Sequence, residues 1–221
     1  MKFVIAAVLA MAMCLAMVAA QEKKHCLGHA FETTAIEMSP HRHLDDISHI
    51  YFDSTTQKMR TDVTVFEPVL GEFSIFTDGH HKQIYTYNKR TGHCERHQFH
   101  GELQEFCLAQ NAKHSHDVDI GGPSGLRAQV WDEKIQGFDI RLILSPGEQH
   151  DVPVNILTRG GHRDAHVTFQ EWWNFQSYRT LPNQRVFEIP QQCLHHAKES
   201  RSAAEHPAVA KAAMITKAFA A

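Results

Sequence analysis

Alternation of side chains with a period of two, over residues 47–106, constrains this chain more than any other feature of its sequence. The segments ISHIYFD, QKMRTDVTVF, EFSIFT, KQIYTYN and HCERHQF follow one another with short polar turns between them. Asp78-Gly79 and Thr91-Gly92 are turn dipeptides, because glycine readily takes the positive φ that a tight hairpin needs. The pattern predicts consecutive antiparallel hairpins, and therefore an all-β, mainly antiparallel protein.

The strand at residues 58–66 is predicted to bury the face that carries Met59, Thr61, Val63 and Val65. Four further strands are predicted in LRAQVWD, FDIRLILS, DVPVNILTR and AHVTFQEWWNFQ. Residues 110–125 are polar and glycine-rich, and they predict a surface loop. Residues 197–221 are rich in alanine and lysine, and they predict either a short C-terminal helix or a disordered tail.

The first twenty residues predict a signal peptide. Lys2 precedes an apolar run that ends in Val18-Ala19-Ala20, a sequence of small residues that suits signal peptidase. A single membrane anchor is the alternative, but the run is short for the ~20 residues that span a bilayer. We therefore expect a secreted, extracellular protein with a β domain at residues 21–196 and a tail at residues 197–221.

Cleavage after residue 20 leaves an even number of cysteines in a chain bound for an oxidising compartment: Cys26, Cys94, Cys107 and Cys193. Such thiols pair, so two disulfides are predicted. The alternative is a zinc site, whose ligands by spacing would be Cys94, His97, His100 and Cys107.

The charge balance points away from nucleic acid and from a polybasic membrane surface. The chain has 22 basic and 25 acidic residues, a formal charge of −3. Histidine is unusually frequent, with 18 residues, so full protonation would move the charge from −3 to +15. The protein would then carry very different charge in an acidic vesicle and outside the cell, although a surface that merely tolerates histidine is the simpler interpretation.

No enzyme signature is present. The chain has no GxSxG, HExxH, Walker or dinucleotide motif, and the glycines at 121–125 do not join a strand to a helix. His93, Glu95 and His97 are candidates for acid–base groups, but no motif surrounds them. We expect a protein that is not an enzyme and has no organic cofactor; an uncharacterised hydrolase is the weakest alternative.

Two histidine pairs are candidates for binding a metal ion. His41 and His43 are two residues apart, as are His114 and His116, so in an extended segment both rings lie on one face and could share zinc or copper.

The order of several segments resembles the ependymin-related protein family. These segments are HCLGHAFE, YFDSTTQKMR, FTDGHHKQIYTYNKRTGHC, DIGGPSGLRAQVW and EIPQQC, and the resemblance covers Cys26 to Cys193. It implies a secreted, disulfide-linked protein that binds calcium, associates with extracellular matrix and forms a homodimer. The implied fold is two stacked antiparallel sheets, curved into a half-barrel around an apolar pocket and similar to bacterial lipoprotein carriers.

The same resemblance implies pairing of Cys94 with Cys193, which leaves Cys26 and Cys107 for each other. Family cysteines near Pro68-Val69 and Glu148-Gln149 are absent here, and so is any Asn-x-Ser/Thr sequon. Calcium would therefore need protein oxygens, for which Asp117 and Asp119 are the candidates; two solvated aspartates are the alternative.

Apolar strand residues are the candidates for lining the implied pocket, although they would equally fill an ordinary β-sandwich core. They are Val63, Val65, Phe73, Ile75, Ile84, Val130, Phe138, Ile140, Leu142, Phe169 and Trp172. The leading hypothesis is a secreted carrier of a small hydrophobic molecule, such as a fatty acid or related lipid. The alternative is a matrix or cell-adhesion protein that acts through its surface and bound calcium or other metal.

We expect the secreted protein to begin at Gln21 and to contain no free thiol, since its four cysteines pair. Intact-mass measurement after alkylation without reduction checks both points. Two alkylatable cysteines would remove one disulfide from this description.

Overall fold

The computed structural model describes residues 25–39, 44–65, 71–122, 124–135, 138–160, 169–181 and 183–199. The predicted signal peptide and residues 200–221 of the predicted tail lie outside this part. The strands are β1 (Ala30–Ser39), β2 (Leu44–Asp53), β3 (Lys58–Val65), β4 (Glu72–Asp78), β5 (Gln83–Asn88), β6 (Cys94–Gln98), β7 (Lys113–Ile120), β8 (Leu126–Ile135), β9 (Phe138–Ser145), β10 (Val152–Gly160), β11 (Phe169–Thr180) and β12 (Lys198–Glu199).

Two short helical elements precede β12: the 3₁₀ helix η1 (Gln184–Phe187) and the α-helix α2 (Gln191–His196). Across the residues described, no helix is both long and apolar enough to cross a membrane.

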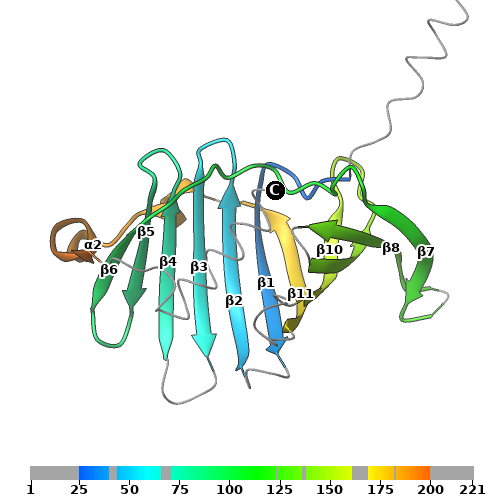
Figure 1. The fold of residues 1–221 in the computed structure, drawn as a ribbon, viewed down its shortest axis with the longest axis horizontal. Helices are drawn as coiled ribbons and strands as arrows, with labels where there is room; N and C mark the ends of the chain where they lie inside the picture. Colours follow the sequence, from blue (N-terminus) through cyan, green and yellow to red (C-terminus); the bar gives the residue numbers. More distant parts are fainter. Residues whose placement is uncertain are drawn as a thin grey trace, which may run out of the picture.

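The strands form one sheet in the order β12-β6-β5-β4-β3-β2-β1-β11-β10-β9-β8-β7 (Figure 1). All neighbours are antiparallel except β12, which pairs with β6 in parallel. The predicted all-β, mainly antiparallel half-barrel with a short C-terminal helix is confirmed. The sheet has two parts that are hydrogen-bonded to each other. The first arm consists of β6, β5, β4, β3, β2, β1 and β11, and the second arm consists of β10, β9, β8 and β7.

The predicted hairpins are all present, because alternation and turn chemistry agree locally. β2 pairs with β3, β4 with β5 and β5 with β6. Met59, Thr61 and Val63 are buried, as the alternation of β3 predicted. The side chain of Val65 is not described.

The strands β1 and β7 were not anticipated from the pattern. β1 had no prediction, and the loop predicted at residues 110–125 is wrong, because residues 113–120 form β7. β7 is the last strand of the second arm and its side chains are mostly exposed. An edge strand with both faces exposed to solvent shows no alternation of apolar and polar residues, so its polar sequence resembles that of a loop.

The main hydrophobic core lies on one face of the sheet, the inner face. Ile75 of β4 and Leu142 of β9 belong to the same buried cluster, although five strands separate β4 from β9 in the sheet order. One cluster includes residues from both arms because the sheet curls around this face. The cluster contains Leu27, Phe31, Ile50, Phe52, Met59, Val63, Ile75, Ile84, Phe99, Leu103, Phe106, Leu142 and Leu144.

Residues 99–112, here called the crossing segment, connect β6 to β7 along one end of the sheet (Figure 1). They bury Phe99, Leu103 and Phe106 in the main core, and Leu103 is completely buried. The amide of Leu27 donates to the carbonyl of Phe106 at 2.9 Å. The crossing segment therefore closes this end of the curl with apolar side chains.

Gln57 anchors the crossing segment to the β2–β3 turn. Its amide nitrogen donates to the carbonyl of Leu103 at 2.7 Å, and its amide oxygen accepts from the N–H of Leu103 at 2.9 Å. Gln57 has φ of 52°, a left-handed conformation that costs energy in a residue other than glycine. Glycine at this position would relieve the backbone and lose both contacts.

The opposite face, here called the outer face, is covered in part by η1, which contacts β3, and by α2, which contacts β6. Cys94 and Cys193 form a disulfide there and pack with Phe76 and Tyr85. Both disulfides follow the pairing implied by the resemblance, since Cys26 is bonded to Cys107. Because Cys94 and Cys107 belong to different disulfides, the zinc site considered for Cys94, His97, His100 and Cys107 is excluded.

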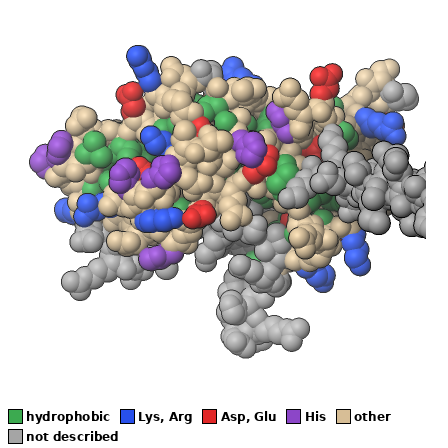
Figure 2. All heavy atoms as spheres, turned by 90° about the horizontal axis from the view of Figure 1, so that it is seen from above, with side chains coloured by type: hydrophobic (Ala, Val, Ile, Leu, Met, Phe, Trp, Pro, Cys, Tyr) green, Lys and Arg blue, Asp and Glu red, His purple; other side chains and the backbone are tan. Residues whose placement is uncertain are grey.

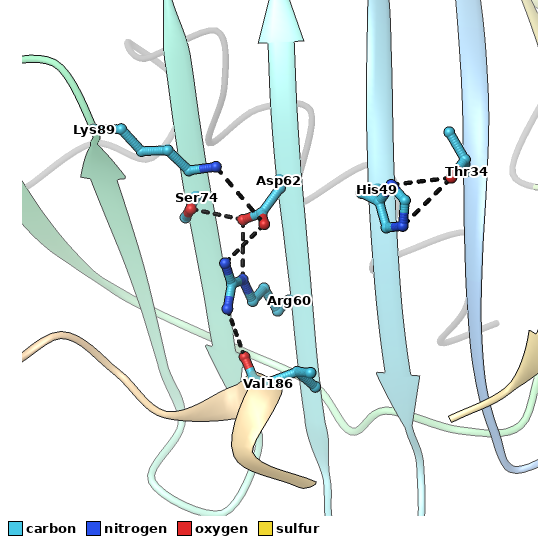
Figure 3. A network of polar contacts seen from close by, with 7 residues as sticks. All are labelled: Thr34, His49, Arg60, Asp62, Ser74, Lys89 and Val186. Atoms are coloured by element: carbon cyan, nitrogen blue, oxygen red, sulfur yellow. Dashed lines mark hydrogen bonds and ion pairs between the residues drawn. The ribbon is translucent and has the colours of Figure 1, made fainter. Parts of the chain in front are cut away.

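An ionic network on the outer face holds η1 (Figure 3). Asp62 accepts two bonds from Arg60, at 2.9 and 2.7 Å, and one from Ser74 at 2.6 Å. Arg60 in turn donates to the carbonyl of Val186 in η1 at 2.9 Å. Burial tends to raise the pKa of Asp62, but these hydrogen bonds and the charges of Arg60 and Lys89 outweigh it, and the pKa is lowered.

Replacing Leu103 with alanine should lower the free energy of unfolding by about 2–5 kcal/mol, the usual cost of removing a fully buried leucine side chain. Leu194→Ala on α2 is the matched control, because Leu194 is 47% exposed and its loss should change stability by less than about 0.5 kcal/mol. Urea denaturation compares the two variants. Equal stabilities would show that the crossing segment does not belong to the core.

Candidate functional site

The inner face brings together several of the residues predicted to line a pocket. Val63, Ile75, Ile84 and Leu142 are members of the main core, and Ile140 packs against it. Phe73 is buried and directly opposite Val63 in the register of β3 and β4, so it shares this face. These residues come from both arms, as a site inside the curl requires.

Other predicted pocket residues lie elsewhere. Trp131 pairs with Leu142, which lies on the inner face, and the adjacent Val130 pairs with Ile143. Successive strand residues face opposite sides, so Val130 points to the outer face. Phe138 is 37% exposed and its ring lies over Gly160, where a side chain would have no room. The side chains of Phe169 and Trp172 are not described.

The crossing segment contributes core residues that the sequence interpretation missed. Phe99, Leu103 and Phe106 occupy the inner face at the end where an open pocket was expected. The only indication in the sequence was that three apolar residues lie close to Cys107. Their spacing matches neither the period of a strand nor that of a helix, so it predicts no buried face. A ligand on the inner face must therefore bind beside the crossing segment, unless that segment moves.

A depression of about 510 Å³ lies beside the main core, at the ends of β7 to β10. Ile140 connects the two, because it packs against the core and also lines the depression. The volume is within the range of small-molecule sites. The lining residues are Asn111, Lys113, Asp132, Glu133, Lys134, Asp139, Ile140, Arg141, Leu157 and Arg159.

The lining of the depression comes from both faces of the sheet. Ile140 shares the inner face with Leu142, whereas Leu157 is paired with Arg141 and therefore lies on the outer face. The depression thus extends around the strand ends, from a polar outer part to the margin of the apolar core.

Cations surround this depression, and two of them are already paired. Arg141 donates two hydrogen bonds to Asp132, at 2.7 and 3.2 Å, and Lys134 lies 2.9 Å from Asp139. The hydrogen bonds from Arg141 are the main cause of the lowered pKa of Asp132. Lys113 and Arg159 have no ion pair with any residue that the structure describes, so their charges are available to an anion.

Glu133 is the buried acid of the depression, with 4% of its surface exposed. Burial raises its pKa, and the N–H of Ala109, which donates to its carboxylate at 2.9 Å, offsets this effect only in part. Ala109 belongs to the crossing segment, so Glu133 ties the depression to that segment.

The predicted calcium ligands lie on β7 and not in a loop. Asp117 contacts His114 at 2.9 Å and Arg127 at 3.3 Å, and the hydrogen bonds from these two residues lower its pKa. Asp119 is opposite Arg127 in the register. Among the residues described, the one group of three metal-type side chains with ligand atoms within 4.8 Å of one another is Cys26, Glu105 and Cys107, of which the cysteines form a disulfide. Calcium binding stays a prediction.

The predicted sharing of a metal by His114 and His116 is wrong. The register of β7 shifts between these residues, so His114 is opposite Trp131 and His116 is opposite Val130. Adjacent residues of β8 face opposite sides, and the extra residue Ser115 therefore separates the two rings. His41 and His43 lie outside the described residues.

No family model and no curated protein matches this chain. Among solved structures, it is similar to the crystal structure of an uncharacterized conserved protein from Thermus thermophilus. The identity is 12%, the TM-score is 0.47, and the match covers 78% of this chain and 90% of that chain. A likeness at this level assigns no function.

Glu133→Gln should stabilise the protein at about pH 7, because it removes a buried charge and keeps an acceptor for the N–H of Ala109. A raised carboxyl pKa in the folded state costs stability once the pH exceeds the unfolded value of about 4.3, so the gain should disappear below that pH. Denaturant midpoints measured across this range test the sign. The exposed Glu188→Gln is the control, and a variant less stable than wild type at about pH 7 would contradict the assignment.

Proposed function

We propose that this protein is a secreted, ependymin-like carrier that binds a small amphiphile, such as a fatty acid or related lipid. The observation that carries the proposal is the depression beside the main core. Its Ile140 packs against the apolar core of the inner face, and its rim holds Lys113 and Arg159, which form no ion pair with the residues that the structure describes. Apolar surface beside placed cations suits a ligand with an apolar chain and an anionic head.

The binding mode follows from this division of the surface. A carboxylate at the rim meets Lys113 and Arg159, and Arg141 has donors beyond the two that it gives to Asp132. The apolar chain passes Leu157 on the outer face and reaches Ile140 around the strand ends.

Secretion and the relation to ependymins are supported by the sequence, the disulfides and the curled sheet, not by the depression. The apolar run that ends in Val18-Ala19-Ala20 supports secretion, and the two disulfides support an oxidising compartment. The pairing of Cys94 with Cys193 and the curled antiparallel sheet agree with what the ependymin resemblance implied. Homodimer formation is part of the same proposal.

We expect a fluorescent fatty acid to bind with one-to-one stoichiometry and to raise the melting temperature, as a ligand that prefers the folded state must. Ile140→Trp should fill the depression and weaken binding at least about tenfold, and Arg159→Gln should weaken it by a smaller factor. Leu142 is unsuitable for this purpose, because it is completely buried and a larger side chain would disrupt the core. Fluorescence titration measures each affinity.

Two control variants make the same kinds of substitution at residues away from the depression. Ile120→Trp changes an exposed isoleucine at the β7–β8 turn, and Arg90→Gln changes an exposed arginine at the β5–β6 turn. Both should bind as wild type. If the fatty acid binds neither wild type nor variants, the carrier function fails, and the matrix or adhesion function through an exposed surface becomes the better proposal.

A further inference from the structure

Three polar side chains of β6 and the residue before it lie on the inner face at the edge of the first arm. His97 is opposite Ile84 in the register, and Ile84 belongs to the main core. Glu95 is two residues away, opposite Thr86, and the carbonyl of His93 accepts from the N–H of Asn88, which continues the same ladder. His93, Glu95 and His97 therefore share one face.

The carboxylate of Glu95 lies between the two imidazoles. Its Oε1 is 3.4 Å from Nε2 of His93, and its Oε2 is 3.6 Å from Nε2 of His97. Exposure decreases along the row, from 45% for the His93 side chain to 27% for Glu95 and 1% for His97. The His93 end is open to solvent, whereas the His97 end is fixed inside the core.

Thr86 supplies an independent indication that something binds here. Its side chain is 4% exposed, and its hydroxyl is buried without a hydrogen-bond partner among the described residues. Directly opposite residues of an antiparallel pair have Cβ atoms about 4.5–5.5 Å apart, so Thr86 is the cross-strand neighbour of Glu95 on the inner face. A buried hydroxyl without a partner is costly, and a ligand or its bound water would satisfy it.

The donor set fits a transition-metal ion. Imidazole nitrogen and carboxylate oxygen bind zinc at about 2.0–2.2 Å, so two such ligands on a tetrahedral ion are about 3.4 Å apart. The separation of His93 Nε2 from Glu95 Oε1 has this value. The two imidazoles are on opposite sides of the carboxylate, so one ion takes His93 and Glu95, and His97 holds the other carboxylate oxygen in place.

We propose that His93 and Glu95 bind one zinc or copper(II) ion at the edge of β6, with His97 as a positioning residue and water completing the coordination. This site is separate from the amphiphile depression, which lies in the second arm. Lys198 of β12 is in register with Glu95 and forms no ion pair with it in the part of the chain described. The positive charge of Lys198 would therefore repel the metal ion and lower its affinity. Copper should bind more tightly than zinc, following the general order of divalent affinities.

Isothermal titration of the full secreted chain with zinc chloride and with copper chloride tests the proposal. Other histidines lie on the surface, and Figure 2 shows several of them on the face seen from above, so total metal uptake does not identify the site. His93→Gln and Glu95→Gln should each remove one equivalent of bound metal. His97→Gln should retain that equivalent and weaken it several-fold, and Lys198→Gln should tighten it.

His80→Gln, at the exposed β4–β5 turn, is the matched control and should leave the stoichiometry unchanged. Melting curves without metal verify that each variant folds, and the metal-induced rise in melting temperature should be lost only in His93→Gln and Glu95→Gln. Unchanged stoichiometry in both of these variants would overturn the metal site. Neither result depends on fatty-acid binding, so this proposal and the carrier function can fail separately.

Discussion

The attachment of the crossing segment to the inner face is the constraint on which the rest of the structure depends. A sheet of this length gains little from curling unless something fills the concavity, and Phe99, Leu103 and Phe106 fill it at one end. Two kinds of bond hold them there: the paired hydrogen bonds of Gln57 to Leu103, and the disulfide between Cys26 and Cys107. These contacts stabilise the left-handed backbone conformation of Gln57, which is otherwise unfavourable for a residue other than glycine.

The two faces of the first arm are closed by different chemistry. The inner face is apolar, whereas the outer face combines a small cluster around the Cys94–Cys193 disulfide with the network of Arg60 and Asp62. Arg60 is suited to this place because its planar guanidinium contacts Asp62, the carbonyl of Val186 and the Phe76 ring together. The 3₁₀ helix η1 is thereby fixed to the outer face of the sheet.

Both groups of polar residues on which the proposals rest lie at the margins of the core. The depression at the ends of β7 to β10 places Lys113 and Arg159, neither of which is in an ion pair within the described part of the chain, beside apolar surface. At the opposite side of the sheet, Glu95 stands between an exposed and a buried histidine. Both places combine access from water with a rigid strand behind them, which is the usual requirement for a binding site.

The sequence by itself determined β2 to β6 and most later strands, because alternation and turn glycines act over a few neighbouring residues. It also determined which residues of β3 share a face. It did not reveal β7, whose strand conformation depends on hydrogen bonds to β8, nor the bulge that separates His114 from His116.

Only the tertiary structure decided which apolar residues of distant strands meet. Val63 and Leu142 share one core, whereas Val130 points away, because the curl and the register of β8 with β9 are long-range properties that no local pattern encodes. The same applies to the depression and to the placement of Thr86 opposite Glu95, since each depends on a pairing of strands that the sequence does not state.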